Sequence, residues 1–208
     1  MATLILDTET TGPPSYGKGP IDIDKEPRMC ALAAGLIDED GTLIETFYEL
    51  VKPLGWSAYV RDNCAEAFKI NGLSLEILEE QGKPVHDVLD RYASMVARCD
   101  GITAFNVAFD QKIIRRERRF IGRHDGYGER PTFCLHYGTL HLGNGNLSER
   151  CRKILGIEPV DAHNALADLK MAAQLFAHVL PLTNTDKKTG EIVPVVRFKE
   201  QTPSSEAA

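Results

Sequence analysis

An apolar run near the start of the chain leads directly into acidic residues. Thr3–Leu6 is followed by the sequence DTETTG, which contains Asp7 and Glu9. A short uncharged apolar run predicts a buried strand. Because side chains alternate along a strand, Asp7 and Glu9 share one face at its end. A fold that buries this strand therefore also places two carboxylates side by side at the edge of its core.

The rest of the pattern predicts a mixed α/β fold in which helices cover a sheet. The further strands are expected at Met29–Ile37, Leu43–Val51, Ile102–Phe105 and Thr132–Leu135, with residues 29–51 forming a hairpin. Helices are expected at Arg61–Ile70, from the capping Ser74 to Gln81, from Pro84 to Cys99, from near Asp110 to Ile121, at Leu147–Leu155 and at Asn164–Leu180. Residues 13–27 predict a long loop, and long loops in compact domains usually have a function or move.

Composition narrows the classes of protein to consider. The 208 residues carry a net charge of −6, which argues against a protein that coats nucleic acid by bulk charge. Five scattered cysteines without a C-x-x-C pair argue against a disulfide scaffold. The sequence shows neither a signal peptide nor an apolar run long enough to span a membrane. We therefore expect a soluble cytoplasmic protein.

Two further acidic residues lie at the ends of expected elements. Asp110 follows the strand candidate 102–105, and Asp168 lies near the start of the helix candidate Asn164–Leu180, five residues after His163. Five residues correspond to roughly 140° around a helix, so His163 must precede the helix and bend back toward Asp168. Each segment also has an ordinary structural explanation: a solvated strand end for Asp7 and Glu9, a favourable helix dipole for Asp110, and a capping role for His163.

The combination of these segments predicts a specific chemistry. Four carboxylates suit hard divalent cations such as Mg²⁺ or Mn²⁺. Two such ions about 3.5–4 Å apart catalyse phosphoryl transfer, and a nearby histidine can act as general base.

With these motifs the chain resembles the DEDDh, DnaQ-like 3′–5′ exonucleases of the ribonuclease H-like superfamily. The resemblance is carried by three ordered motifs: Asp7-Thr-Glu9-Thr-Thr-Gly12, Asn106-x-x-Phe109-Asp110 and His163-x-Ala-x-x-Asp168. It implies a mixed sheet of three antiparallel strands followed by parallel strands. It also implies an exonuclease domain over residues 1–181. Residues 182–208 differ in composition and predict an extension that is partly disordered or a short hairpin, with a strand over Ile192–Phe198 and a frayed tail over Gln201–Ala208.

The resemblance also assigns roles to individual residues. Asp7, Glu9, Asp110 and Asp168 would bind two Mg²⁺ or Mn²⁺ ions, and His163 would be the general base. The terminal nucleotide would meet the backbone around Thr10, Thr11 and Gly12, with Asn106 and Phe109 nearby. Arg115 and Arg116 belong to a basic cluster after Asp110 that could contact phosphates, although such a run is as often a solvated helix face.

The expected substrate is a single-stranded or frayed 3′ end, with DNA favoured over RNA. Three alternatives remain open at this stage. The chain could be an RNA-trimming exoribonuclease, a proofreading or accessory subunit that docks to a polymerase through residues 182–208, or an inactive fold kept for binding. The last is disfavoured because all five catalytic positions hold suitable side chains.

Overall fold

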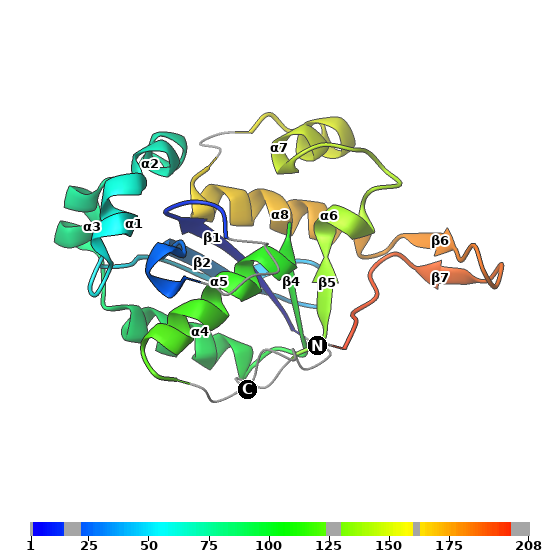
Figure 1. The fold of residues 1–208 in the computed structure, drawn as a ribbon. Coiled ribbons are helices and arrows are strands. Elements are labelled where there is room, and N and C mark those ends of the chain that lie inside the picture. The colour runs from blue at the N-terminus through cyan, green and yellow to red at the C-terminus, as the bar shows by residue number, and fades with distance from the viewer. Residues whose placement is uncertain (1, 15–21, 124–129, 160–162, 201–208) are drawn as a thin grey trace.

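The computed structural model describes residues 2–14, 22–123, 130–159 and 163–200. Its centre is a five-stranded sheet with the order β3-β2-β1-β4-β5 (Figure 1). The strands are β1 (Thr3–Thr10), β2 (Met29–Ile37), β3 (Leu43–Leu50), β4 (Gly101–Ala104) and β5 (Thr132–Cys134). β1, β2 and β3 are antiparallel, whereas β4 and β5 run parallel to β1. This arrangement confirms the predicted mixed sheet.

Helices cover both faces of the sheet. Leu4 and Leu6 of β1 pack into one apolar cluster with α4 (Val85–Val96) and α5 (Val107–Phe120), while Ile5 packs into a second cluster with α8 (Ala165–Val179). Alternation along the strand thus sends successive side chains into two separate layers. Among the described residues no helix is long and apolar enough to cross a membrane.

The remaining helical segments surround this core (Figure 1). Three short helices follow β3, a pair of short turns follows β5, and one helical turn precedes β2. They are α1 (Ala58–Asn63), α2 (Ala65–Asn71), α3 (Leu75–Gln81), α6 (Leu135–Gly138), α7 (Leu147–Arg150) with the π-helical turn η2 (Cys151–Leu155), and the 3-10 turn η1 (Ile23–Lys25).

Several predicted boundaries were wrong. β1 continues to Thr10 because its backbone still pairs with β2 there, so both acids lie inside the strand and not beyond it. The single helix expected at Arg61–Ile70 is two helices, and Ser57 caps the first of them by accepting a bond from Val60 N–H. The helix expected at Leu147–Leu155 changes at Cys151 into the π-helical turn.

The C-terminal segment forms its own hairpin. β6 (Thr183–Thr185) pairs with β7 (Ile192–Pro194), and both extend away from the body in Figure 1. β7 is shorter than the strand expected over Ile192–Phe198. After it, the chain returns to the sheet, where the backbone of Lys199 pairs with that of Thr132 at 2.8 Å. The frayed tail expected at 201–208, and residues 15–21 of the expected long loop, lie outside the described residues.

Candidate active site

Three carboxylates meet at the end of β1 that lies beside α8. One oxygen each from Asp7, Glu9 and Asp168 lies within 4.8 Å of the other two. Asp7 and Glu9 share a face of β1, opposite Ala33 and Ala31 of β2. Those small side chains leave room above the sheet for the two acids and for the first turn of α8, which carries Asp168.

Asp110 belongs to the other face of the same strand end. It is buried in the first turn of α5, where one oxygen accepts bonds from Thr8 N–H at 3.0 Å and from Thr8 Oγ1–H at 2.8 Å. Thr8 lies between Asp7 and Glu9 and points to the α5 side because side chains alternate. Asp110 is therefore close enough for its charge to raise the pKa of Asp7, but it is outside the group of three within the described residues.

Burial and mutual repulsion make this acidic cluster costly without a cation. Burial, with the charges of Asp168 and Asp110, raises the pKa of Glu9 to about 8. Burial raises the pKa of Asp110 to about 7 despite the two bonds from Thr8. The pKa values of Asp7 and Asp168 are also raised, in both cases first by burial. A bound divalent cation would offset the repulsion between these carboxylates and so favour their ionised forms.

One buried oxygen of the cluster suits a cation. Asp168 Oδ1 is buried and has no hydrogen-bond partner among the described residues, although a buried carboxylate oxygen normally has one. Its second oxygen accepts a bond from His163 N–H at 3.2 Å. The donor set of hard oxygens and the unpartnered atom both fit Mg²⁺ or Mn²⁺.

His163 occupies the position predicted for it, immediately before the helix. It has a left-handed backbone with φ of 67°, which is unusual for a residue other than glycine. Asn164 then caps α8 by accepting bonds from the N–H groups of Leu166 and Ala167. The turn leaves the His163 side chain exposed and near enough for its charge to act on the pKa of Asp168. Strained backbone of this kind is often found at functional sites.

The residues expected to meet the terminal nucleotide lie around the same strand end. Thr10 Oγ1–H donates to Gly12 O at 2.8 Å, and Thr11 N–H donates to Arg28 O at 2.9 Å. A Cβ built on Gly12 would meet no atom of the described residues within 4 Å, so that part of the structure leaves the space beside this backbone open. Asn106, at the start of α5, is exposed, whereas Phe109 is half-buried and packs against the core.

The expected basic track is only partly at the surface. Arg116 is buried and forms an ion pair with the buried Glu26, so it cannot also contact a phosphate, and this part of the prediction was wrong. Arg115 is half-buried on the same helix. Because successive residues of a helix point in different directions, Arg115 and Arg116 have different surroundings. The sequence alone did not show which arginine the segment before β2 would cover.

Two residues near the cluster were not singled out as site residues in the sequence. Thr8 holds Asp110 in place, as described above. Asn71, the last residue of α2, donates from its side-chain amide to Thr10 O at 3.4 Å, and a bond from it lowers the pKa of Glu9. Their contacts in the tertiary structure identify them: Thr8 lies within the first motif but had no role assigned to it, and Asn71 lies outside all three motifs.

The raised pKa values predict how pH and metal affect stability. The folded carboxylates bind protons more tightly than the unfolded ones, so the unfolding free energy of the metal-free protein should fall as pH rises from about 5 to about 8. Mg²⁺ or Mn²⁺ should therefore raise the melting temperature more at pH about 8 than at pH about 6. Thermal unfolding at matched ionic strength measures both effects.

Glu9→Gln is the control for that measurement. It should flatten the fall in stability with pH because it removes the carboxyl whose pKa is raised to about 8. A metal effect that is equal at both pH values, or greater at the lower one, would contradict the assignment of these acids as the cation site.

Comparisons with known proteins give a match to a family profile and to two polymerases. Residues 4–176 match the sequence profile of the RNase_T family, described as "Exonuclease". Two DNA polymerase III proteins of the PolC type, from Thermotoga petrophila and Thermotoga maritima, are each 26% identical over 176 residues. That match covers 83% of this chain but 11% of each polymerase, so the chain spans about a tenth of these relatives.

Solved structures of exonuclease I share the fold. E. coli exonuclease I in complex with a dA16 oligonucleotide superposes with a TM-score of 0.67 at 19% identity, covering 86% of this chain and 40% of that one. The zinc-bound complex of the E. coli enzyme with single-stranded DNA gives 0.68 at 19%, with the same coverage. The enzyme from Methylocaldum szegediense gives 0.66 at 17%, covering 86% and 41%. At such identities the likeness shows the fold alone, and it confirms the predicted ribonuclease H-like architecture.

Proposed function

Since this chain belongs to the exonuclease family, whose profile it matches over residues 4–176, we propose that it is a metal-dependent 3′–5′ exonuclease. It hydrolyses the terminal phosphodiester of a single-stranded or frayed nucleic acid, with DNA favoured, and releases nucleoside monophosphates. The observation that carries this proposal is the group of oxygens from Asp7, Glu9 and Asp168 within 4.8 Å of one another.

The acidic cluster would hold two Mg²⁺ or Mn²⁺ ions, with Asp110 completing the set from the α5 side. Bound divalent cations supply stabilisation of the negative charge that develops on the phosphate during hydrolysis. Thr8 keeps Asp110 oriented through its two hydrogen bonds. His163 N–H orients Asp168 in the same way from the other side. Asp7, Glu9 and Asp168 thus approach one another from β1 and α8, and Asp110 lies on the other face of the same strand end, on α5.

The proton and the substrate are handled by the residues around that point. The exposed imidazole of His163 takes the proton from the attacking water as general base. The backbone from Thr10 to Gly12, fixed to Arg28 through Thr11, lies against the terminal nucleotide. Asn106 is exposed where α5 begins and offers an amide to the same nucleotide.

A degradation ladder tests this function. The protein is incubated with 5′-labelled single-stranded DNA and with RNA of the same sequence, in Mg²⁺ or in EDTA. We expect labelled products that shorten stepwise from the 3′ end, faster with DNA, and none in EDTA. Faster shortening of RNA would instead assign an RNA-trimming role. An internally cut pattern, or activity that survives EDTA, would contradict the proposed mechanism.

The PolC-type relatives favour a second candidate, an exonuclease that works as the proofreading or accessory subunit of a polymerase. Residues 182–208 were the expected docking segment. In the isolated chain, however, Val195 is buried in the core and the ring of Phe198 lies 6.2 Å from that of Phe133. Removing the whole segment would therefore disturb the fold, and substitutions on the exposed β6–β7 hairpin are the cleaner way to look for a partner.

A further inference from the structure

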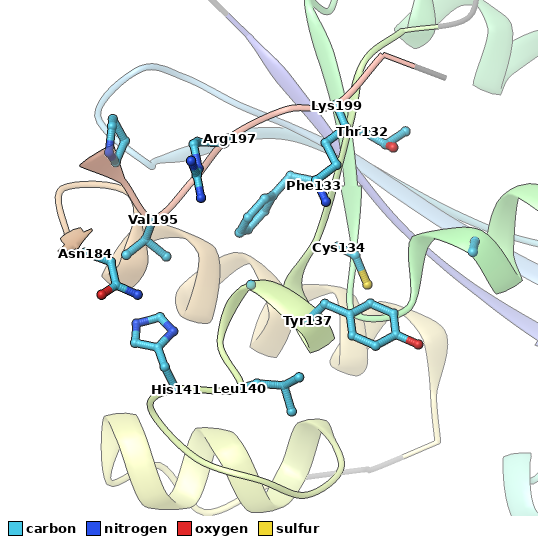
Figure 2. A pocket seen from close by; sticks show the side chains of 13 residues that line it. Thr132, Phe133, Cys134, Tyr137, Leu140, His141, Asn184, Val195, Arg197 and Lys199 are labelled. Carbon is cyan, nitrogen blue, oxygen red and sulfur yellow. The ribbon is translucent and has the colours of Figure 1, made fainter. Parts of the chain in front are cut away.

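A second site lies on the far side of β5 from the acidic cluster. A pocket of about 560 Å³ opens between α6 and the segment that follows β7 (Figure 2). This volume is within the range of roughly 300–1,000 Å³ that is usual for small-molecule sites. Its wall includes Phe133, Tyr137, His141, Asn184, Arg197 and Lys199.

The lining combines hydrogen-bond donors with aromatic surface. Arg197, Asn184 and His141 gather on one side of the pocket, the ring of Phe133 forms part of its wall, and Tyr137 lies on the other side (Figure 2). Among the described residues that line the pocket, none carries a carboxylate. Arg197 also contacts Asp186 at 3.4 Å, which holds its guanidinium from the hairpin side. In a chain with net charge −6, such a cationic pocket selects for an anion.

The cationic wall is fixed to the core. Between Arg197 and Lys199, the ring of Phe198 packs 6.2 Å from that of Phe133 and 6.5 Å from that of Phe176. The same ring lies over Gly101, where a Cβ would approach it to 2.5 Å. Backbone bonds of 2.8 Å join Lys199 to Thr132 in both directions. The backbone that carries both cations is therefore held in place before any ligand binds, which lowers the entropic cost of binding.

The opposite wall is equally well supported. Arg150 is fully buried (0% exposed) and donates to the backbone of Leu135, His136 and Gly145 and to Thr139 Oγ1. These bonds hold α6 and its following turn as one unit. Tyr137 remains 68% exposed at the rim, so its ring is accessible to a ligand.

A line of aromatic rings connects the pocket with the catalytic edge of the sheet. Phe105, directly before Asn106, lies edge-to-face with His136 at 5.4 Å, and His136 lies edge-to-face with Tyr137 at 5.1 Å. Ala108, two residues before Asp110 on α5, lines the pocket itself. Exposed aromatic rings beside a cationic groove are the usual means of binding single-stranded nucleic acid.

We propose that this pocket holds a nucleotide of the single strand upstream of the 3′ end that is being hydrolysed. Its base stacks on Tyr137, and its phosphates contact Arg197 and Lys199. The proposal rests on the proposed exonuclease function and adds a second contact for the strand. A protein segment would fit less well, because four nitrogen donors without a carboxylate match phosphate better than an apolar peptide.

The test is equilibrium binding of labelled single-stranded DNA in EDTA, where no hydrolysis is expected. The probes are a dinucleotide and an oligonucleotide of about 16 nucleotides, the upper end of what one such binding module covers. The variants are Tyr137→Ala and the double variant Arg197→Ala/Lys199→Ala. The matched control is Lys187→Ala/Lys188→Ala, which removes the same charge from the exposed turn of the same hairpin.

Tyr137→Ala should weaken binding of the longer probe by roughly 5- to 100-fold. The double variant should weaken it as well and should reduce the slope of log K against log salt by about 1.4, because two phosphate contacts are lost. Binding of the dinucleotide, and its cleavage in Mg²⁺, should stay as in the wild type. The control should retain wild-type affinity for the longer probe.

The outcomes separate this inference from the proposed function. The pocket inference alone is overturned if the wild type degrades DNA but the pocket variants bind the longer probe as tightly as the control variant does. Variants that weaken both probes equally would also overturn it, because the change would then act on the fold or on the catalytic end. A wild type that neither binds nor degrades any strand would overturn both proposals.

Discussion

Asp168→Asn should reduce the hydrolysis rate by at least about 10²–10³-fold and at the same time stabilise the metal-free protein. Activity falls because the amide removes one charged oxygen from the group that would hold the cations. Stability rises because burial raises the pKa of Asp168, which shows that the charged form is disfavoured there. Asparagine keeps the size of the side chain and an oxygen that can accept the bond from His163 N–H.

Two measurements check this result: single-turnover cleavage in Mg²⁺ and urea unfolding in EDTA. Asp87→Asn is the control, since Asp87 is an exposed aspartate in the first turn of α4, and its substitution removes the same charge. The control should leave the cleavage rate unchanged. A loss of both activity and stability in Asp168→Asn would mean that Asp168 is a structural residue, and the metal site would have to be rejected.

Glu117→Ala should lower the unfolding free energy by about 3–5 kcal/mol, as expected when one partner of a buried ion pair is removed. The Arg28 and Glu117 side chains are 5% and 1% exposed, and Arg28 donates to both carboxylate oxygens at 2.8 Å. Glu117 also accepts a bond from Met29 N–H at 2.9 Å. The alanine variant would leave the Arg28 guanidinium buried without its counter-charge.

An exposed pair of the same chemistry serves as the control. Arg98 donates to both oxygens of Glu45 at 2.7 and 2.9 Å, but the two side chains are about half exposed. Glu45→Ala should therefore cost only about 0–1 kcal/mol in urea unfolding. The double variant Arg28→Met/Glu117→Leu should recover part of the loss, because no unpaired charge remains. Equal losses for Glu117→Ala and Glu45→Ala would show that the buried pair has no special role.

Buried ion pairs on α5 also explain why the basic cluster predicted from the sequence is only partly at the surface. The run Arg115, Arg116, Arg118 and Arg119 suggested a cationic face of one helix. In the structure, the segment before β2 covers one side of α5, where Glu26 pairs with Arg116 and Arg28 pairs with Glu117. The partners are about 90 residues apart in the sequence. Local spacing has no information on contacts over such a separation.

The sheet elements were predictable because their signals are local. Met29–Ile37 is an uninterrupted apolar run, and all nine of its residues are buried in the second strand of the sheet. Ser74 caps a short helix as predicted, and the helix expected from Asn164 begins directly after that residue. The end of β1 was missed for the opposite reason. Polar residues 7–10 carry no strand signal of their own and remain extended because β2 pairs with them.

The sequence by itself determined the order of strands and helices, the alternation that places Asp7 and Glu9 on one face, and the turn that puts His163 before α8. Each of these follows from side-chain periodicity or capping within a few residues. Only the tertiary structure decided that Asp168 joins Asp7 and Glu9 while Thr8 holds Asp110 on the other face. It also decided that Arg116 is buried and that Arg197 and Lys199 line a pocket beside α6. Those outcomes depend on how segments that are distant in the sequence pack together. The contacts involved join residues that no local sequence pattern relates to one another.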